Sequence, residues 1–187
     1  MATFSTNDLK NGMTLDLDGD LMQVVSFQHV KPGKGGAFVR TMLKNARTGA
    51  VIDRTFRAGE KVDRAFIEKR EQQFLYRDGS DYIVMDTESY EQSTVSAIAM
   101  GDAANYIVEN STITILRFGE EVIGTDLPAA VELVVTETEP GLQGDRVSGA
   151  RKPAKLETGL ELQVPLFVEQ GSKIKVDTRS GEYLTRV

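Results

Sequence analysis

The chain has 187 residues, 40% of them hydrophobic and 27% charged, a composition that excludes an intrinsically disordered protein. It has no cysteine, which excludes disulfides and thiolate metal sites and indicates a reducing compartment. Its N-terminus lacks a signal-peptide pattern and no segment approaches the roughly 18 apolar residues of a membrane span, so we expect a cytoplasmic protein with no membrane partner.

The net charge of −6 is distributed unevenly. Residues 1–64 carry 10 Lys and Arg against 7 Asp and Glu, residues 65–127 carry 4 against 12, and residues 128–187 carry 8 against 9. Phosphate binding depends on the local field, so the first third can hold a polyanion, whereas the acidic middle disfavours indiscriminate binding to nucleic acid. Charged faces that are simply solvated are an equal alternative on charge alone.

Residues 1–63 predict short strands separated by tight turns. Asp18-Gly19 and Arg47-Thr48-Gly49 are turn signals, and residues 59–63 are interpreted as a connector. The predicted strands are 14–17, 21–25, 37–43 and 50–56. Four or five short strands in about 60 residues favour a small barrel, since closure leaves no exposed edge.

The remainder of the chain predicts two further barrels. Its strands are expected at 73–76, 82–85, 112–116, 131–136, 160–164, 174–177 and 183–186. A short helix is expected at 101–108 with Asp102 as its N-cap, and Asp126-Leu127-Pro128 marks a boundary. Five strands with one short helix are typical of an oligonucleotide-binding (OB) barrel, and the pattern occurs twice. We therefore predict an all-β protein of three small barrels, at 1–63, 64–127 and 128–187.

An unusual turn lies at residues 30–38, which read VKPGKGGAF. Pro32 fixes the angle at which the chain enters, and glycines remove side chains from around one cation, Lys34. These glycines are Gly33, Gly35 and Gly36. The pattern suits a slim cationic probe, although a plain exposed turn explains it better when the residues are taken alone. A phosphate-binding P-loop is excluded, because it would need Gly at 28 and Ser or Thr at 35.

The chain offers few residues for catalysis. Its only histidine, His29, has no cysteine or second histidine for a metal cluster or a nucleophile relay. The carboxylates of residues 65–127 are interpreted as a solvated face, not as an acid–base pair. We therefore expect no catalytic residue, no metal site, no cofactor and no enzyme activity.

Several stretches closely resemble the bacterial elongation factor P family, in the same order from end to end. The stretch KVDTRSGEY at 175–183 is the most specific. The matching stretches are VKPGKGGAF at 30–38, YRDG at 76–79, MDTESYEQ at 85–92, TEPGLQGD at 138–145, KPAKLETG at 152–159 and VPLFVEQGSKIKVDTRSGEYLTRV at 164–187.

The resemblance implies an SH3-like (KOW-like) first domain followed by two OB-fold domains, in an L-shaped, tRNA-like outline. It implies a monomeric factor that binds the 70S ribosome between the P and E sites and promotes peptide-bond formation at polyproline stalls. Lys34 would contact the CCA end of the peptidyl-tRNA, and a lysine-modifying enzyme would be a further partner. Pro32 and the three glycines would shape the loop.

The resemblance also assigns residues at the far end of the chain. Tyr183 and Arg186 match family positions near the tRNA backbone. Gly144 and Asp145 match a loop that faces the mRNA codon in the E site, and Arg146 stands where that loop often has threonine, so it keeps a hydrogen-bond donor and adds a charge.

Two other functions stay open at this point. One is a generic KOW/OB RNA-binding module acting on ribosomal RNA or transcription complexes, which predicts salt-sensitive binding to naked RNA. The other is a small hydrolase using the carboxylates of residues 65–127, whose turnover would survive Lys34→Ala.

Overall fold

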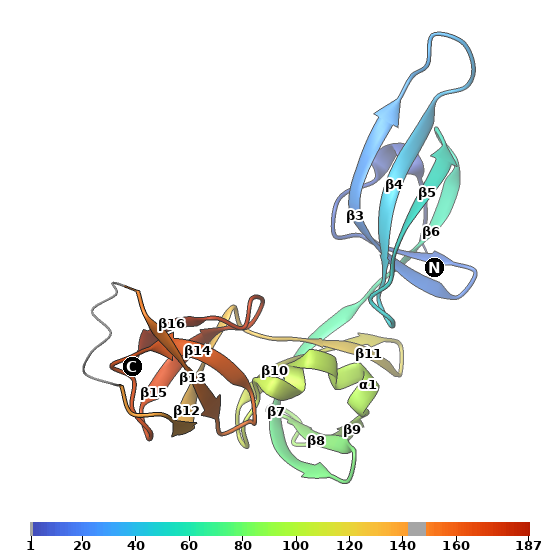
Figure 1. The fold of residues 1–187 in the computed structure, drawn as a ribbon. Coiled ribbons are helices and arrows are strands. Elements are labelled where there is room, and N and C mark those ends of the chain that lie inside the picture. The colour runs from blue at the N-terminus through green and yellow to red at the C-terminus, as the bar shows by residue number, and fades with distance from the viewer. Residues whose placement is uncertain (1, 142–148) are drawn as a thin grey trace. The chain divides into compact units, whose positions relative to one another are not determined.

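The structure is a computed structural model that describes residues 2–141 and 149–187 (Figure 1). These residues form sixteen β-strands, one single-turn α-helix and two short 3-10 helices, which confirms the predicted all-β class. No helix in this described part is long and apolar enough to cross a membrane. Three predicted site residues, Gly144, Asp145 and Arg146, lie outside the described residues.

The chain folds into two compact units, and each is described by itself. The first comprises Met1–Lys69 with Leu116–Gly124, and the second comprises Arg70–Ile115 with Thr125–Val187. Residues 116–124, which the sequence assigns to the middle domain, thus belong to the same unit as the first barrel. The domain boundaries at 63/64 and 127/128 stay predictions.

The first barrel is a six-stranded antiparallel sheet in the order β1-β6-β2-β3-β4-β5. Its strands are β1 (Ala2–Ser5), β2 (Thr14–Leu17), β3 (Asp20–Val30), β4 (Phe38–Asn45), β5 (Val51–Arg57) and β6 (Lys61–Ala65), with a 3-10 turn η1 at Thr6–Asp8. The buried side chains that form its core are Leu9, Leu15, Met22, Val24, Val39, Leu43, Phe56 and Val62.

One prediction for this barrel was wrong. Residues 59–63 were expected to be a connector, but β6 begins at Lys61 and pairs with both β1 and β2. The reason is long-range: Phe4 pairs with Val62, which is buried, so the extreme N-terminus makes this segment a strand. Charged residues on either side of Val62 conceal that role from a local pattern.

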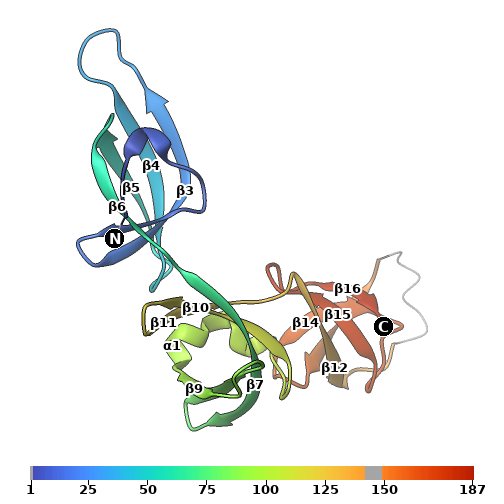
Figure 2. The same cartoon turned by 180° about the vertical axis from the view of Figure 1, so that it is seen from behind.

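The β3–β4 hairpin is the longest feature of the first unit and carries the PGKG turn at its tip (Figure 1 and Figure 2). Pairing runs out to Val30 opposite Phe38, so residues 31–37 project beyond the last rung of the ladder. A bulge between Val24 and Ser26 adds a residue to β3, and such bulges bend and twist a strand. The predicted hairpin is therefore present, on strands longer than expected.

The middle sheet has the order β11-β10-β7-β8-β9. Its strands are β7 (Glu68–Asp78), β8 (Asp81–Asp86), β9 (Gln92–Val95), β10 (Thr112–Phe118) and β11 (Glu121–Asp126). Tyr82, Val84, Val95 and Ile113 are among the side chains buried here.

The helix prediction at 101–108 is corrected by the structure. The α-helix α1 spans Ala97–Met100, where the Ser96 hydroxyl caps it by accepting a hydrogen bond from the Ala99 N–H. Gly101 follows with φ +52°, and residues Gly101–Asn105 form the 3-10 turn η2 instead. Asp102 is thus not the N-cap, because serine at 96 satisfies the free N–H groups first.

The C-terminal sheet has the order β14-β13-β12-β15-β16. Its strands are β12 (Ala130–Thr138), β13 (Arg151–Leu156), β14 (Glu161–Pro165), β15 (Lys173–Asp177) and β16 (Tyr183–Arg186). Its core comprises Leu133, Val135, Ala154, Leu156, Leu162, Val164, Val168, Ile174 and Val176.

Candidate functional site

Lys34 lies in the exposed loop between β3 and β4. Every residue from Lys31 to Gly36 is exposed, and Val39, the first buried residue beyond the loop, belongs to the ladder. The loop therefore adds nothing to the core, and its shape is imposed by the paired strands at its base. The Lys34 ammonium, exposed in a loop that the paired strands support, is available to an anionic partner.

The glycines around Lys34 differ in what the fold requires of them. Gly35 has φ +107°, a conformation that side chains with a Cβ rarely adopt, so the turn itself needs this glycine. At Gly33 and Gly36 an added Cβ would meet no atom within 4 Å, and neither has a left-handed backbone. The fold of this chain therefore does not explain glycine at 33 and 36.

The sheet that supports the loop carries exposed basic side chains along its strands. Four cationic side chains on β4 and β5 are exposed: Arg40, Lys44, Arg54 and Arg57. The Arg54 guanidinium carbon lies 5.1 Å from the Phe56 ring centroid, which holds that side chain along the strand. The local positive charge expected from the sequence thus falls on the sheet that supports the Lys34 loop.

Tyr183 and Arg186 lie on β16, at the edge of the C-terminal sheet. Residues three apart on a regular strand face opposite sides, but a register shift between Lys175 and Val176 adds one residue. Tyr183 consequently pairs with Val176 and Arg186 with Ile174, which places both on one face.

These two side chains differ in burial. Tyr183 is half-buried and packs against the C-terminal core, whereas Arg186 is exposed. The Arg186 guanidinium carbon lies 5.7 Å from the ring centroid of Phe167, itself 57% exposed. Sequence reasoning did not single out Phe167, because its neighbourhood with Arg186 depends on the fold of the two segments.

The turn before β16 is held by Asp177. Its carboxylate accepts hydrogen bonds from the N–H groups of Arg179 (2.8 Å) and Ser180 (2.9 Å), and these bonds lower the pKa of Asp177. Because the folded-state pKa is lowered, the turn is stabilised above the ordinary pKa of 3.8 and loses that support as the pH falls through the folded-state value.

The middle domain repeats this turn at Asp86. That carboxylate accepts from the N–H groups of Glu88 (2.8 Å) and Ser89 (2.9 Å), and its pKa is lowered for the same reason. The segments DTESYE at 86–91 and DTRSGE at 177–182 thus make the same turn in both OB-type domains. This match supports the predicted repetition of the pattern.

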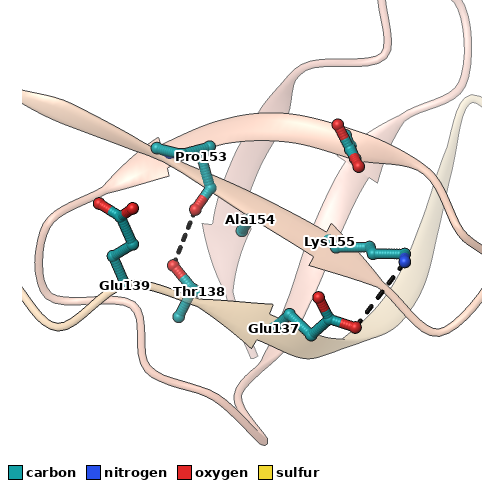
Figure 3. Close-up of a pocket in the computed structure, with 7 residues that line it drawn as sticks. Glu137, Thr138, Glu139, Pro153, Ala154 and Lys155 are labelled. Carbon is teal, nitrogen blue, oxygen red and sulfur yellow. Dashed lines mark hydrogen bonds and ion pairs between the residues drawn. The ribbon is translucent and has the colours of Figure 1, made fainter.

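A shallow pocket in the C-terminal domain lies between β12, β13 and β14 (Figure 3). Lys155 lies 3.7 Å from a carboxylate oxygen of Glu137, and the Thr138 hydroxyl donates to the Pro153 carbonyl at 2.9 Å. Four of the residues that line this pocket are thus paired with one another. Within the described residues, no three His, Cys, Asp or Glu side chains gather where they could hold a metal ion.

The lone histidine lies on β3, opposite Val39. Its ring meets the Phe27 ring edge-on at a centroid distance of 5.6 Å. This contact fits the interpretation of His29 as a strand residue beside a basic loop.

Comparison with known proteins decides the family. Three family models match, the elongation factor P KOW-like domain over residues 5–62, the elongation factor P OB domain over 67–125 and the elongation factor P C-terminal domain over 131–186. Elongation factor P of Acidothermus cellulolyticus is 59% identical over 186 residues, which cover 100% of this chain and 98% of the relative. The chain belongs to the elongation factor P family. Elongation factor P of Moorella thermoacetica is 56% identical over 182 residues, covering 97% of this chain and 98% of the relative.

A solved structure has the same fold over much of the chain. Eukaryotic translation initiation factor 5A from Methanococcus jannaschii aligns with a TM-score of 0.55 at 21% identity, covering 68% of this chain and 92% of that one. These comparisons confirm the predicted series of KOW-like and OB domains and the predicted membership in the elongation factor P family. The protein is a member of a family of translation elongation factors. The tRNA-like outline stays a prediction.

Proposed function

We propose that this protein binds the ribosome between the P and E sites and promotes peptide-bond formation at polyproline stalls. It does so by placing Lys34 against the CCA end of the peptidyl-tRNA. Family membership supports a role in translation, and the exposed Lys34 at the tip of the β3–β4 hairpin is the observation that carries the proposal.

A cation at this position accelerates the reaction by positioning. Proline is a sterically awkward donor and acceptor, so a peptidyl-tRNA stalled on consecutive prolines samples unproductive poses. Holding its CCA end in a near-attack geometry lowers the entropic part of the barrier and requires no covalent step by the factor. The ammonium of Lys34 supplies a donor for phosphate and ribose oxygens, and the proposal needs no catalytic side chain.

The loop around Lys34 suits entry into a crowded centre. The paired strands below it end at Val30 and Phe38, so only residues 31–37 need to enter. Glycine at 33 and 36, which the fold of this chain does not require, leaves the backbone slim on both sides of Lys34. The exposure of the whole loop also leaves Lys34 accessible to a lysine-modifying enzyme.

The C-terminal barrel supplies a second contact. Arg186 is exposed and shares a face with Tyr183, which suits a phosphate oxygen and an adjoining ribose or base of the tRNA. Gly144, Asp145 and Arg146 contact the mRNA codon in the E site in this proposal. The factor acts as a monomer.

Lys34→Ala is expected to leave the fold intact, because the loop packs against nothing in the core, and to remove most of the stimulation of triproline synthesis. Lys34→Arg is expected to be intermediate, since it keeps the charge but not the slimness or a lysine-specific modification. The measurement is the rate of triproline synthesis in a reconstituted translation system, with melting temperature as the fold control. Lys31→Ala, which removes an equal charge from the base of the loop, is the matched variant and is expected to keep most of the stimulation. A wild-type rate for Lys34→Ala sinks the proposal.

Gly33→Ala and Gly36→Ala test whether slimness matters. Both variants are expected to melt like the wild type, because the added methyl groups meet no atom of this chain within 4 Å. Both are expected to slow triproline synthesis severalfold, because the methyl groups obstruct the approach to the tRNA. Gly35→Ala serves as the contrast, since φ +107° makes it alter the turn itself. Wild-type rates for both the 33 and 36 variants would mean that the loop does not enter a tight space.

Arg186→Ala tests the division of work between the two ends of the chain. Losing a charge-assisted hydrogen bond to phosphate typically costs on the order of 1–3 kcal/mol, which corresponds to roughly a tenfold or greater loss of affinity. We therefore expect Arg186→Ala to raise the half-saturation concentration on stalled ribosomes and to leave the plateau rate unchanged. Lys34→Ala is expected to lower the plateau rate and to leave the half-saturation concentration unchanged. Lys175→Ala, on the opposite face of the same strand pair, is the matched control. A lowered plateau at an unchanged half-saturation point contradicts this assignment.

A further inference from the structure

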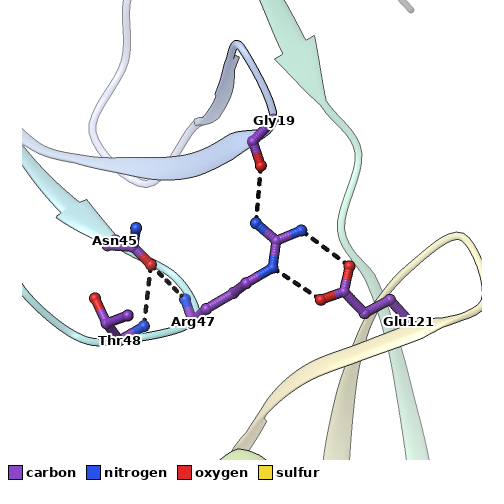
Figure 4. A network of polar contacts seen from close by, with 5 residues as sticks. All are labelled: Gly19, Asn45, Arg47, Thr48 and Glu121. Atoms are coloured by element: carbon purple, nitrogen blue, oxygen red, sulfur yellow. Dashed lines mark hydrogen bonds and ion pairs between the residues drawn. The ribbon is translucent and has the colours of Figure 1, made fainter.

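Arg47, in the turn between β4 and β5, hydrogen-bonds to Glu121 of the β10–β11 hairpin (Figure 4). Its Nε and Nη2 donate to the two carboxylate oxygens of Glu121 at 2.8 and 2.9 Å, which is a bidentate pair. Its remaining nitrogen, Nη1, donates to the Gly19 carbonyl at 2.8 Å. One guanidinium thus joins two turns of the first barrel to a hairpin whose sequence belongs to the middle OB domain. We call these three residues the Arg47 clamp.

The backbone around the clamp is also held. The Asn45 side-chain oxygen accepts from the N–H groups of Arg47 (2.9 Å) and Thr48 (3.0 Å), so the turn that presents Arg47 is fixed from within. The N–H of Gly19 donates to the Asp16 carboxylate at 2.8 Å, which fixes the turn that offers the carbonyl. The guanidinium therefore binds between two ordered turns and loses little freedom on pairing.

A small apolar cluster lies in the same unit and joins the same elements. Leu21 of β3, Ala65 of β6 and Ile123 of β11 are buried against one another. The partly buried residues around them are Ala46, Ile67, Leu116 and Phe118. This cluster spans the first barrel, the connection after it and the β10–β11 hairpin. Apolar contact supplies adhesion between these parts, whereas the bidentate pair fixes their orientation.

Charge on the clamp persists over a wide pH range. The hydrogen bonds with Arg47 lower the pKa of Glu121, and the same bonds raise the pKa of Arg47. The side chains are 34% and 49% exposed, so solvent screens their attraction. The contribution of such a pair to overall stability is small, and its geometric role is the larger one.

We propose that the Arg47 clamp is a positioning device, which makes the first barrel and the β10–β11 hairpin one body and so fixes the direction in which the Lys34 loop points. The inference rests on the proposed function, in which Lys34 must meet the CCA end. Arg47 and Glu121 themselves touch no substrate in this account. They act through Lys34, at the other end of the β3–β4 hairpin.

The clamp is expected to affect rate and not binding. A factor with a loose first barrel still docks through its C-terminal contact, but its tip spends less of the bound time in the productive pose. Small misplacements of a positioning group lower rates strongly, whereas they leave ground-state binding by remote groups unchanged. Arg47→Ala and Glu121→Ala are therefore expected to lower the plateau rate of triproline synthesis about three- to tenfold, with the half-saturation concentration unchanged.

The rigidity that the clamp gives to the first barrel and the β10–β11 hairpin can be measured without translation, as the distance between two spin labels. Because the chain has no cysteine, cysteines introduced at Lys61 and Glu120 carry two spin labels without background labelling. The distance distribution between these labels is expected to broaden in Arg47→Ala and in Glu121→Ala. The double variant is expected to be no worse than either single one, in distance distribution and in plateau rate, because both remove one shared contact.

Matched variants separate the clamp from charge and from general stability. Glu120→Ala removes an equal charge from the same turn and is expected to keep the wild-type plateau. Arg47→Lys keeps the charge but cannot form the bidentate pair, so it is expected to behave like Arg47→Ala. Unchanged label distances in Arg47→Ala, or broadened distances with a wild-type plateau, overturn the inference. Lys34→Ala is measured in the same assay. If Lys34→Ala keeps the wild-type plateau rate, the proposed function fails. If Lys34→Ala lowers the plateau rate and Arg47→Ala does not, only the inference about the clamp is refuted.

Discussion

The pairing of β3 with β4 out to Val30 and Phe38 is the interaction on which the presentation of Lys34 depends. A loop that packs against nothing has no shape of its own unless its two ends are held at a fixed separation. The ladder provides this through backbone hydrogen bonds at alternate residue pairs and through inward side chains such as Val39 and Leu43. The paired strands beneath the slim cationic tip therefore fix the separation of the two ends of the loop.

The need to present Lys34 in a fixed direction also explains why the first barrel contacts the β10–β11 hairpin. A long hairpin transmits any rocking of its base to its tip, so the orientation of the base matters as much as the loop. The bidentate pair between Arg47 and Glu121 and the buried contact of Leu21 with Ile123 both act at that base. The chain thus places its specific contacts far from Lys34 and leaves the residues around Lys34 bare.

Local patterns predict the strands whose alternation is visible and miss those in which polar or charged residues hide it, whether the partner strand is distant, as for β6, or near, as for β13. The runs at β2, β4 and β12 alternate plainly, and the turns at Asp18-Gly19 and Arg47-Thr48-Gly49 have the glycines with positive φ that such turns require. β13 was missed because Lys152 occupies an inward position, where its ammonium donates to the Glu139 carbonyl at 2.6 Å. A buried lysine has the signature of a surface residue in any hydrophobicity pattern.

The candidate sites divide in the same way. Lys34 and its glycines are contiguous, so their arrangement could be predicted from the sequence. The common face of Tyr183 and Arg186 could not, because it depends on a bulge whose register is set by β15. The Arg47 clamp brings residues 47 and 121 together and leaves no trace in local composition.

In the proposed function, Lys34 contacts the CCA end of the peptidyl-tRNA. A photo-crosslinking amino acid in place of Lys34, in the factor bound to a ribosome stalled on consecutive prolines, tests this contact directly. We expect crosslinks to the 3′-terminal nucleotides of the P-site tRNA, and none to those nucleotides from the same probe placed at Lys175. Crosslinks from position 34 to other RNA or protein, with the factor demonstrably bound, would contradict it.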